Sequence, residues 1–163
     1  MTQLNGRCSC GAVKYRMTDA PMFIHCCHCL DCQRQTGSAF VLNALIVADR
    51  VEQLSGETRE SPQPTDSGRP HIIHRCGECG TALWSNYGGR REIRFVRIGT
   101  LEKPSALSPD VHIYTRSKQP WLQLPGSGVG STTGKPAEIC EAYYDSSKLW
   151  PAASLTRRKA VFG

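Results

Sequence analysis

Short runs in which apolar residues alternate with polar ones, or follow one another directly, recur along the chain and predict β-strands. Residues 12–17 alternate as a half-buried strand does, and residues 40–47 are more continuously apolar, as in a more fully buried strand. Further stretches of this kind begin at His71, Thr81, Glu92 and Val111. The pattern predicts a mostly antiparallel β domain with short connections.

Helical signals are few. A short helical turn is predicted over residues 30–35, and residues 137–150 have moderate helical character. Residues 61–70 are rich in Pro, Ser and Asp, cannot sustain a helix and predict an exposed loop.

The composition changes near residue 124. Residues 124–136 have the Gly, Ser and Thr content of a flexible connector. We therefore expect a domain over residues 1–123, followed by the connector and a C-terminal extension over residues 124–163. The length of 163 residues suits one such domain with extensions.

Composition and charge narrow the class of protein. No stretch approaches the roughly 20 apolar residues that a membrane span needs, and the first residues lack a signal-peptide pattern, so a soluble, cytoplasmic protein is expected. The net charge of +6 favours an anionic partner without choosing one. Basic residues are scattered in pairs such as Arg90 with Arg91, which argues against a dedicated nucleic-acid surface.

Nine cysteines are the most informative part of the composition. An odd number without a secretion signal argues against a disulfide framework, because the cytosol keeps thiols reduced. Clustered cytosolic cysteines are more often metal ligands or catalytic groups. Eight of the nine fall in three clusters: Cys8 and Cys10; Cys26, Cys27, Cys29 and Cys32; Cys76 and Cys79.

The C-x-x-C-G sequence at Cys76 and Cys79 is typical of a zinc knuckle. A tight turn directs two thiolates at one ion, and the following glycine lets backbone N–H groups approach the sulfurs. Structural zinc is almost always bound by four protein ligands in a tetrahedron. The knuckle therefore needs a second pair of ligands from elsewhere in the chain.

Two pairs of cysteines could complete this knuckle. Cys29 with Cys32 would make an ordinary zinc ribbon with C-x-x-C at both ends. Cys8 with Cys10 would instead close a four-cysteine site that ties the start of the chain to its middle. The second pairing is favoured, because the first would leave Cys8, Cys10 and Cys27 without a role.

The favoured pairing leaves Cys27, Cys29 and Cys32 as a C-x-C-x-x-C set. Three protein ligands and an exchangeable fourth position are the pattern of a catalytic zinc. A fourth ligand from His25 or His28 would close the site and weaken that interpretation.

Together these motifs resemble the glutathione-dependent formaldehyde-activating enzyme family, which includes centromere protein V. The resemblance runs from Gly6 to Trp121, about seven tenths of the chain. It is carried by G-R-C-S-C-G-A-V from Gly6, C-H-C-L-D-C-Q-R-Q-T-G-S from Cys27, R-C-G-E-C-G-T-A-L from Arg75, G-T-L-E-K-P from Gly99 and S-K-Q-P-W from Ser117.

The resemblance implies a zinc-stabilised, antiparallel β-tent fold with two zinc ions per chain. The implied ligands are Cys8, Cys10, Cys76 and Cys79 for a structural zinc, and Cys27, Cys29 and Cys32 for a labile or catalytic one. The family pattern selects Cys27 over Cys26, whose side chain would point to the opposite face of an extended segment and pack as a small hydrophobe. The implied activity joins glutathione to formaldehyde.

We therefore expect a carbon–sulfur lyase that joins a thiol to a small aldehyde. Zinc deprotonates a bound thiol, which could attack the aldehyde carbon, or its open position could polarise the carbonyl; a third alternative is that it only binds and delivers a thiol. Glutathione carboxylates would need cations, for which the candidates are Arg34, Arg94, Arg97 and Lys118. Trp121 is a candidate to line a pocket, and Cys140 is expected to pack.

The rival interpretation is a noncatalytic zinc module that binds a thiol, protein or nucleic-acid partner, as the centromere branch of the family suggests. The scattered basic residues and the lack of a long basic arm count against it.

Overall fold

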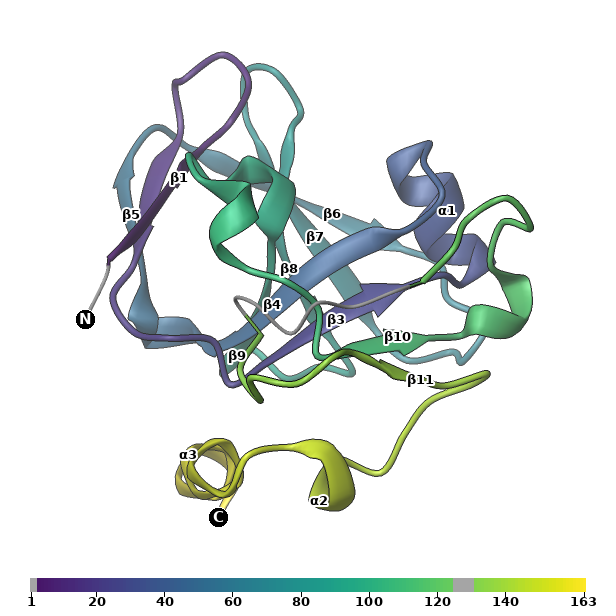
Figure 1. The fold of residues 1–163 in the computed structure, drawn as a ribbon. Coiled ribbons are helices and arrows are strands. Elements are labelled where there is room, and N and C mark those ends of the chain that lie inside the picture. Colours follow the sequence, from purple (N-terminus) through teal and green to yellow (C-terminus); the bar gives the residue numbers. More distant parts are fainter. Residues whose placement is uncertain (1–2, 125–130) are drawn as a thin grey trace. The chain divides into compact units, whose positions relative to one another are not determined.

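The computed structural model describes residues 3–124 and 131–163, which contain eleven strands and three α-helices (Figure 1). The described residues group into two compact units. The first comprises Met1–Ala20 and Leu45–Pro104, and the second comprises Pro21–Ala44 and Ser105–Gly163. The predicted fold class, mostly β with short helical segments, is confirmed.

The first unit consists of antiparallel strands. One sheet has the order β1-β2-β5, and β6, β7, β8 and β9 lie beside one another in sequence order. The strands are β1 Leu4–Arg7, β2 Lys14–Met17, β5 Val51–Ser55, β6 Thr58–Gln63, β7 His71–Cys76, β8 Ala82–Tyr87 and β9 Ile93–Arg97. Short 3-10 turns lie at Ala48–Arg50, directly before β5, and at Ile98–Thr100, directly after β9.

The alternation of residues 12–17 builds the core of this unit. Val13, Tyr15 and Met17 are buried, and the Tyr15 ring meets the Trp84 ring edge-on, with 5.6 Å between centroids. Gly6 pairs with Tyr15 in the β1–β2 register, and a Cβ on Gly6 would lie 2.2 Å from the Tyr15 ring. Glycine is therefore required at position 6, because any larger residue would clash with the Tyr15 ring.

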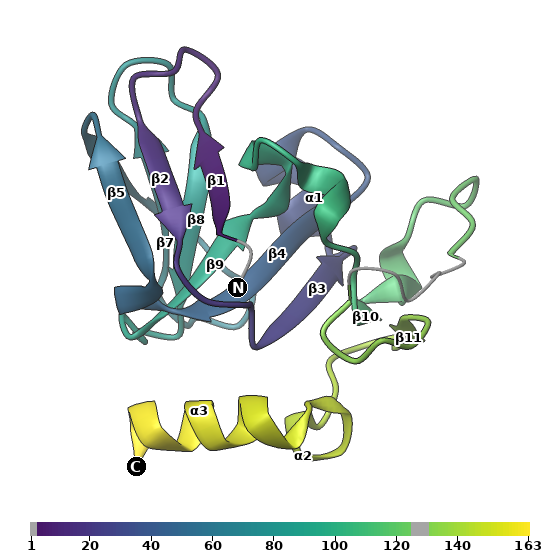
Figure 2. The same ribbon diagram turned by 60° about the vertical axis from the view of Figure 1, so that its left-hand side comes forward.

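The second unit is arranged around a fully buried strand, β3 Phe23–Cys27. Its neighbours are β4 on one side and β10 on the other, with β11 beyond β10 (Figures 1 and 2). The bounds are α1 Leu30–Thr36, β4 Val41–Val47, β10 Val111–Ile113, β11 Glu138–Ile139, α2 Ser146–Leu149 and α3 Ala152–Phe162, with 3-10 turns at Pro104–Ala106 and Thr115–Ser117. The boundary between the units falls within β4.

All six predicted strands are present, and α1 confirms the predicted helical turn. Three details differ. β6 extends to Gln63, so the predicted loop over residues 61–70 begins as an edge strand, where proline is tolerated. Residues 137–150 contain a short strand and only one helical turn, and the longer helix α3 follows them. β3, β10 and β11 pair in parallel, not antiparallel.

Part of the predicted connector over residues 124–136 is held in place. Residues 125–130 lie outside the described residues. After them, the buried Asp110 carboxylate accepts hydrogen bonds from the Thr132 hydroxyl at 2.8 Å and the Thr133 amide at 3.0 Å. It also accepts one from the Ile24 amide at 2.7 Å. The carboxylate thus joins the extension to the start of β3.

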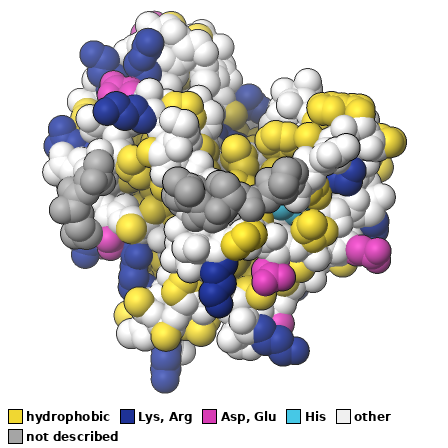
Figure 3. All heavy atoms as spheres, viewed as in Figure 1, with side chains coloured by type: hydrophobic (Ala, Val, Ile, Leu, Met, Phe, Trp, Pro, Cys, Tyr) yellow, Lys and Arg dark blue, Asp and Glu magenta, His cyan; other side chains and the backbone are white. Residues whose placement is uncertain are grey.

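The surface agrees with the scattered charge of the sequence. On the face drawn in Figure 3, Lys and Arg side chains stand singly or in small groups among neutral and hydrophobic ones. No helix in the described part of the chain is long and apolar enough to cross a membrane.

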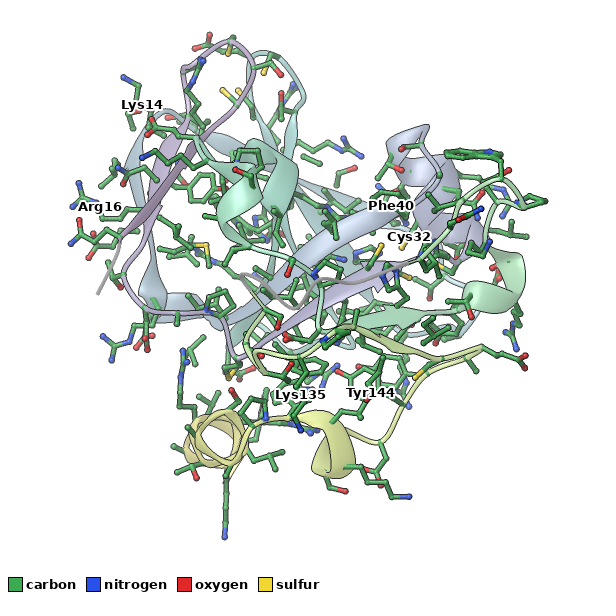
Figure 4. All side chains as sticks on the ribbon, in the orientation of Figure 1. Lys14, Arg16, Cys32, Phe40, Lys135 and Tyr144 are labelled. Atoms are coloured by element: carbon green, nitrogen blue, oxygen red, sulfur yellow. The ribbon has the colours of Figure 1, made fainter. Side chains whose placement is uncertain are left out.

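Aromatic residues of the C-terminal extension pack on β3. The Trp150 ring stacks on Phe23, with centroids 5.5 Å apart, and the Trp150 indole N–H donates to the Tyr144 oxygen at 2.7 Å. The same oxygen is hydrogen-bonded to Nε2 of His25. Burial lowers the pKa of His25 to about 3, so the imidazole is neutral and can accept the Tyr144 proton. Figure 4 labels Tyr144 beside β10 and β11.

We expect Tyr144→Phe to lower the free energy of unfolding by about 1–3 kcal/mol, because it leaves the buried His25 and Trp150 nitrogens without this oxygen. Urea unfolding measures the change. Tyr87→Phe is the matched control, since the Tyr87 hydroxyl bonds to Ser67 at an exposed site, and it should change stability by about 0.5 kcal/mol or less. Equal stability of Tyr144→Phe and the wild type would contradict a role of this oxygen in fixing the extension.

Candidate metal centres

Two turns of the first unit bring four cysteine sulfurs together. Cys8 and Cys10 follow β1, while Cys76 ends β7 and Cys79 lies in the turn before β8. Their sulfurs all lie within 4.8 Å of one another, with 3.4 Å between Cys8 and Cys10 and 3.8 Å between Cys10 and Cys76. Sulfurs about 2.3 Å from a tetrahedral zinc ion lie about 3.8 Å apart. The group has the chemistry and spacing to hold a metal ion.

In both turns, a glycine with positive φ follows the second cysteine. Gly11 follows Cys10 and Gly80 follows Cys79, and both have positive φ, at 80° and 74°. This left-handed conformation is open to glycine without strain, and it turns the chain back after the second cysteine of each pair. The C-x-C-G and C-x-x-C-G motifs therefore contain glycine for the same reason.

Thr81 connects the two turns, a role that the motif analysis did not assign. Its hydroxyl accepts from the Ser9 amide at 3.2 Å and lies 3.1 Å from the Cys79 sulfur. Hydrogen bonds from the Thr81 side chain and backbone lower the pKa of the Cys79 thiol to about 5. Thr81 thus favours a thiolate at Cys79.

The second group forms where β3 passes into α1. Cys27 is the last residue of β3, Cys29 is the N-cap of α1, and Cys32 lies in its first turn. The Cys29 sulfur accepts the Cys32 amide proton at 3.3 Å. Hydrogen bonds from the Cys27 and Cys32 thiols hold the pKa of Cys29 far below its usual range. These hydrogen bonds favour a thiolate within the three-cysteine group.

The structure places the seven candidate ligand cysteines in two separate groups. The Cys29 and Cys32 sulfurs gather with Cys27 and not with the knuckle at Cys76. Neither histidine considered as a fourth ligand joins this group, because Nε2 of His25 bonds to Tyr144 and Nε2 of His28 faces Cys26 and His112.

A third group of donors was not predicted from the sequence. The Cys26 sulfur lies 3.4 Å from Nε2 of His28, which lies 3.0 Å from Nδ1 of His112. All three side chains are buried. Burial lowers the pKa of His28 to about 4 and lowers that of His112, so both imidazoles are neutral at pH 7. Burial also raises the pKa of the Cys26 thiol to about 12.

The loop between Cys27 and Cys32 is fixed by hydrogen bonds from two sides. The Gln33 amide donates to the His28 carbonyl at 2.8 Å and to the Ser117 carbonyl at 2.9 Å. The Ser117 hydroxyl donates to the His28 carbonyl at 3.0 Å, and Gln119 donates to Gln33 at 2.7 Å. The S-K-Q-P-W motif therefore supports the cysteine loop from a distant part of the chain.

A pocket of about 470 Å³ lies beside α1. Trp121, which is 70% exposed, lines it, as the sequence analysis considered. The other lining residues are Leu30, Gln33, Arg34, Gly37, Ser38, Ala39 and Gln119. Because Gln33 follows Cys32 directly, the pocket adjoins the helix that contains Cys32 and is capped by Cys29. Figure 4 labels Cys32 on this helix.

The four cationic candidates differ in their surroundings. Arg34 lines this pocket and lies 3.6 Å from Asp31. In the first unit, Arg94 packs over the Trp84 ring and donates to a backbone carbonyl, and Arg97 is buried. Lys118 donates to the carbonyls of Gln119 and Leu122. Arg34 is thus the candidate that lines this pocket.

Comparisons with known proteins agree with the motifs. The family model described as "Glutathione-dependent formaldehyde-activating enzyme" matches residues 3–117. A Halomonas elongata protein named "Putative glutathione-dependent formaldehyde-activating enzyme" is 25% identical over 126 residues, covering 74% of this chain and 80% of that protein. A crystal structure of a Rhodobacter sphaeroides protein is similar over 60% of this chain and 87% of its own, with 19% identity and a TM-score of 0.44.

We expect Gln33→Ala to lower the free energy of unfolding by about 1–2 kcal/mol, because it removes donors to the His28 and Ser117 carbonyls. Denaturant unfolding gives the value. Arg34→Ala, one position further on the same helix, is the control and should cost about 0.5 kcal/mol or less, since its side chain is 71% exposed. The support that we assign to Gln33 would be wrong if both variants lost the same stability.

Proposed function

Because the chain belongs to the glutathione-dependent formaldehyde-activating enzyme family, we propose that it joins the glutathione thiol to formaldehyde as a carbon–sulfur lyase. The observation that carries this proposal is the three-cysteine group at the start of α1, beside a pocket large enough for a small molecule. The cytosol keeps glutathione reduced, and we expect the protein to act there.

The metal assignment is part of this proposal. A structural zinc would be held by Cys8, Cys10, Cys76 and Cys79, and a second zinc by Cys27, Cys29 and Cys32. All seven ligands are thiols, which suit zinc, and the spacing of the first group fits a tetrahedron. Three protein ligands at the second site leave a position for an exchangeable group.

The reaction conserves atoms and charge. A bond forms between the glutathione sulfur and the formaldehyde carbon, the carbonyl π bond becomes an O–H bond, and the thiol proton ends on the oxygen. A zinc ion held by Cys27, Cys29 and Cys32 would lower the pKa of a bound thiol or polarise the carbonyl. The product is S-(hydroxymethyl)glutathione.

The residues around the three cysteines position the substrate. Trp121 offers an apolar face at the pocket, and Arg34 offers a cation to a carboxylate. A zinc ion with three thiolates has a formal charge of −1 and would repel an anionic substrate, so a nearby cation lowers the cost of binding. Gln33 and Gln119, which also line the pocket, keep the cysteine loop in place.

The first test measures zinc content and activity in two cysteine variants. We expect Cys29→Ser to bind one zinc fewer than the wild type, to stay folded and to lose at least about 100-fold of the rate of adduct formation. Cys76→Ser should lose the structural zinc and unfold or lose several kcal/mol of stability. The rate is measured by exchange NMR of glutathione with formaldehyde, against the uncatalysed background.

Cys140→Ser is the control for cysteine replacement, since Cys140 lies outside the three donor groups. A folded Cys29→Ser variant with full activity would end the catalytic proposal. Wild-type protein that binds zinc and glutathione without accelerating the reaction would favour the noncatalytic module instead, and steeply salt-dependent binding to nucleic acid would identify its partner.

Trp121→Ala tests the pocket. We expect the KM for glutathione to rise about 10-fold with little change in kcat, because about 1.4 kcal/mol of apolar contact is lost in both the ground and transition states. Leu54→Ala is the control, since Leu54 is another exposed apolar residue, on β5, away from the pocket lining. An unchanged KM would place the glutathione site elsewhere.

A further inference from the structure

The third donor group follows from strand geometry. Side chains alternate along an extended segment, so Cys26 and His28 point to the face opposite Cys27. His112 stands directly beside Cys26 in the parallel β3–β10 register, and paired residues direct their side chains to the same face. Cys26, His28 and His112 therefore meet on the face of β3 that the three-cysteine group does not use.

The distances between these donors fit a coordinated ion. A tetrahedral zinc with nitrogen ligands at about 2.0 Å and sulfur at about 2.3 Å sets nitrogens about 3.3 Å apart, and nitrogen and sulfur about 3.5 Å apart. The separations here are 3.0 Å between the two imidazole nitrogens and 3.4 Å between the His28 nitrogen and the Cys26 sulfur. All three donor atoms lie within 4.8 Å of one another.

Hydrogen bonds among these three side chains do not account for all of their close contacts. Nε2 of His28 has either one proton or one lone pair, yet it faces both a sulfur and a nitrogen. The other nitrogen of this ring, Nδ1, is buried without a hydrogen-bond partner among the described residues, so the ring is oriented through Nε2 alone. A cation between the donors would accept a lone pair from each of them.

We propose that Cys26, His28 and His112 form a third metal site, which binds Zn²⁺ through one sulfur and two nitrogens. Imidazole and thiolate together suit zinc. One thiolate and two neutral imidazoles around a divalent ion give a net charge of +1. This charge offsets the −1 of a zinc bound by the three neighbouring cysteines, which lowers the cost of burying both ions.

The decisive measurement is zinc X-ray absorption on the full chain, loaded with zinc and freed of excess metal, together with zinc content. The two cysteine sites contain no histidine, so imidazole scattering reports the third site alone. We expect three zinc ions per chain with imidazole scattering in the wild type. Cys26→Ala and His112→Gln should each bind one zinc fewer and lose most of the imidazole signal, with circular dichroism unchanged. Cys140→Ala should match the wild type.

Two results would overturn the third site. One is a zinc-loaded wild type that shows no imidazole scattering. This result needs only the wild type, so it would stand even if the variants did not fold. The other is imidazole scattering that persists at unchanged zinc content in Cys26→Ala, since a histidine would then bind an ion of the three-cysteine group. Failure of the proposed function is distinct: if Cys27, Cys29 and Cys32 held no zinc, the wild type would bind two ions and still show imidazole.

Discussion

The backbone of His28 is the point on which the arrangement of the second unit depends. Its N–H donates to the Ile113 carbonyl at 3.0 Å, and its carbonyl accepts from Gln33 and Ser117 at 2.8 and 3.0 Å. These bonds fix the two peptide units that flank the His28 Cα, between the end of β3 and the start of α1. Because cysteines stand on either side of this residue, the same bonds position Cys27 and Cys29. They also hold the His28 side chain toward Cys26 and His112.

In the first unit, the strands bring together two cysteine pairs that are far apart in the chain. The Cys10 and Cys76 sulfurs meet across a separation of 66 residues. Closing a loop of that length costs conformational entropy, and the pairing of the antiparallel strands in this unit offsets part of that cost. The glycines after Cys10 and Cys79, and the Thr81 hydroxyl between the turns, then leave the sulfurs at a spacing that suits zinc. A metal ion bound by the four sulfurs would contribute further to the stability of this unit.

The C-terminal extension is part of the packing of the second unit. Tyr144 and Trp150 cover Phe23 and His25, the residues of β3 that precede its cysteines. β11 extends the pairing of β10 with β3, and Asp110 binds residues that lead into β11. The extension therefore stabilises the strand that positions two of the three donor groups, although the family match ends before it.

The sequence by itself determined the residue types and local spacings. The alternation of residues 12–17 identified β2, and residues 30–35 predicted the helical turn of α1. The cysteine motifs predicted the local pairs and the C-x-C-x-x-C set, because ligands two or three residues apart can meet in one turn, but local spacing left two choices for the pair that joins Cys76 and Cys79. Tertiary structure alone decided the contact of His28 with His112, 84 residues away, and of His25 with Tyr144, 119 residues away. Such contacts depend on which strands become neighbours and in what register. The parallel pairing of β3 with β10 has no local signature in either strand, because register follows from the packing of the whole unit.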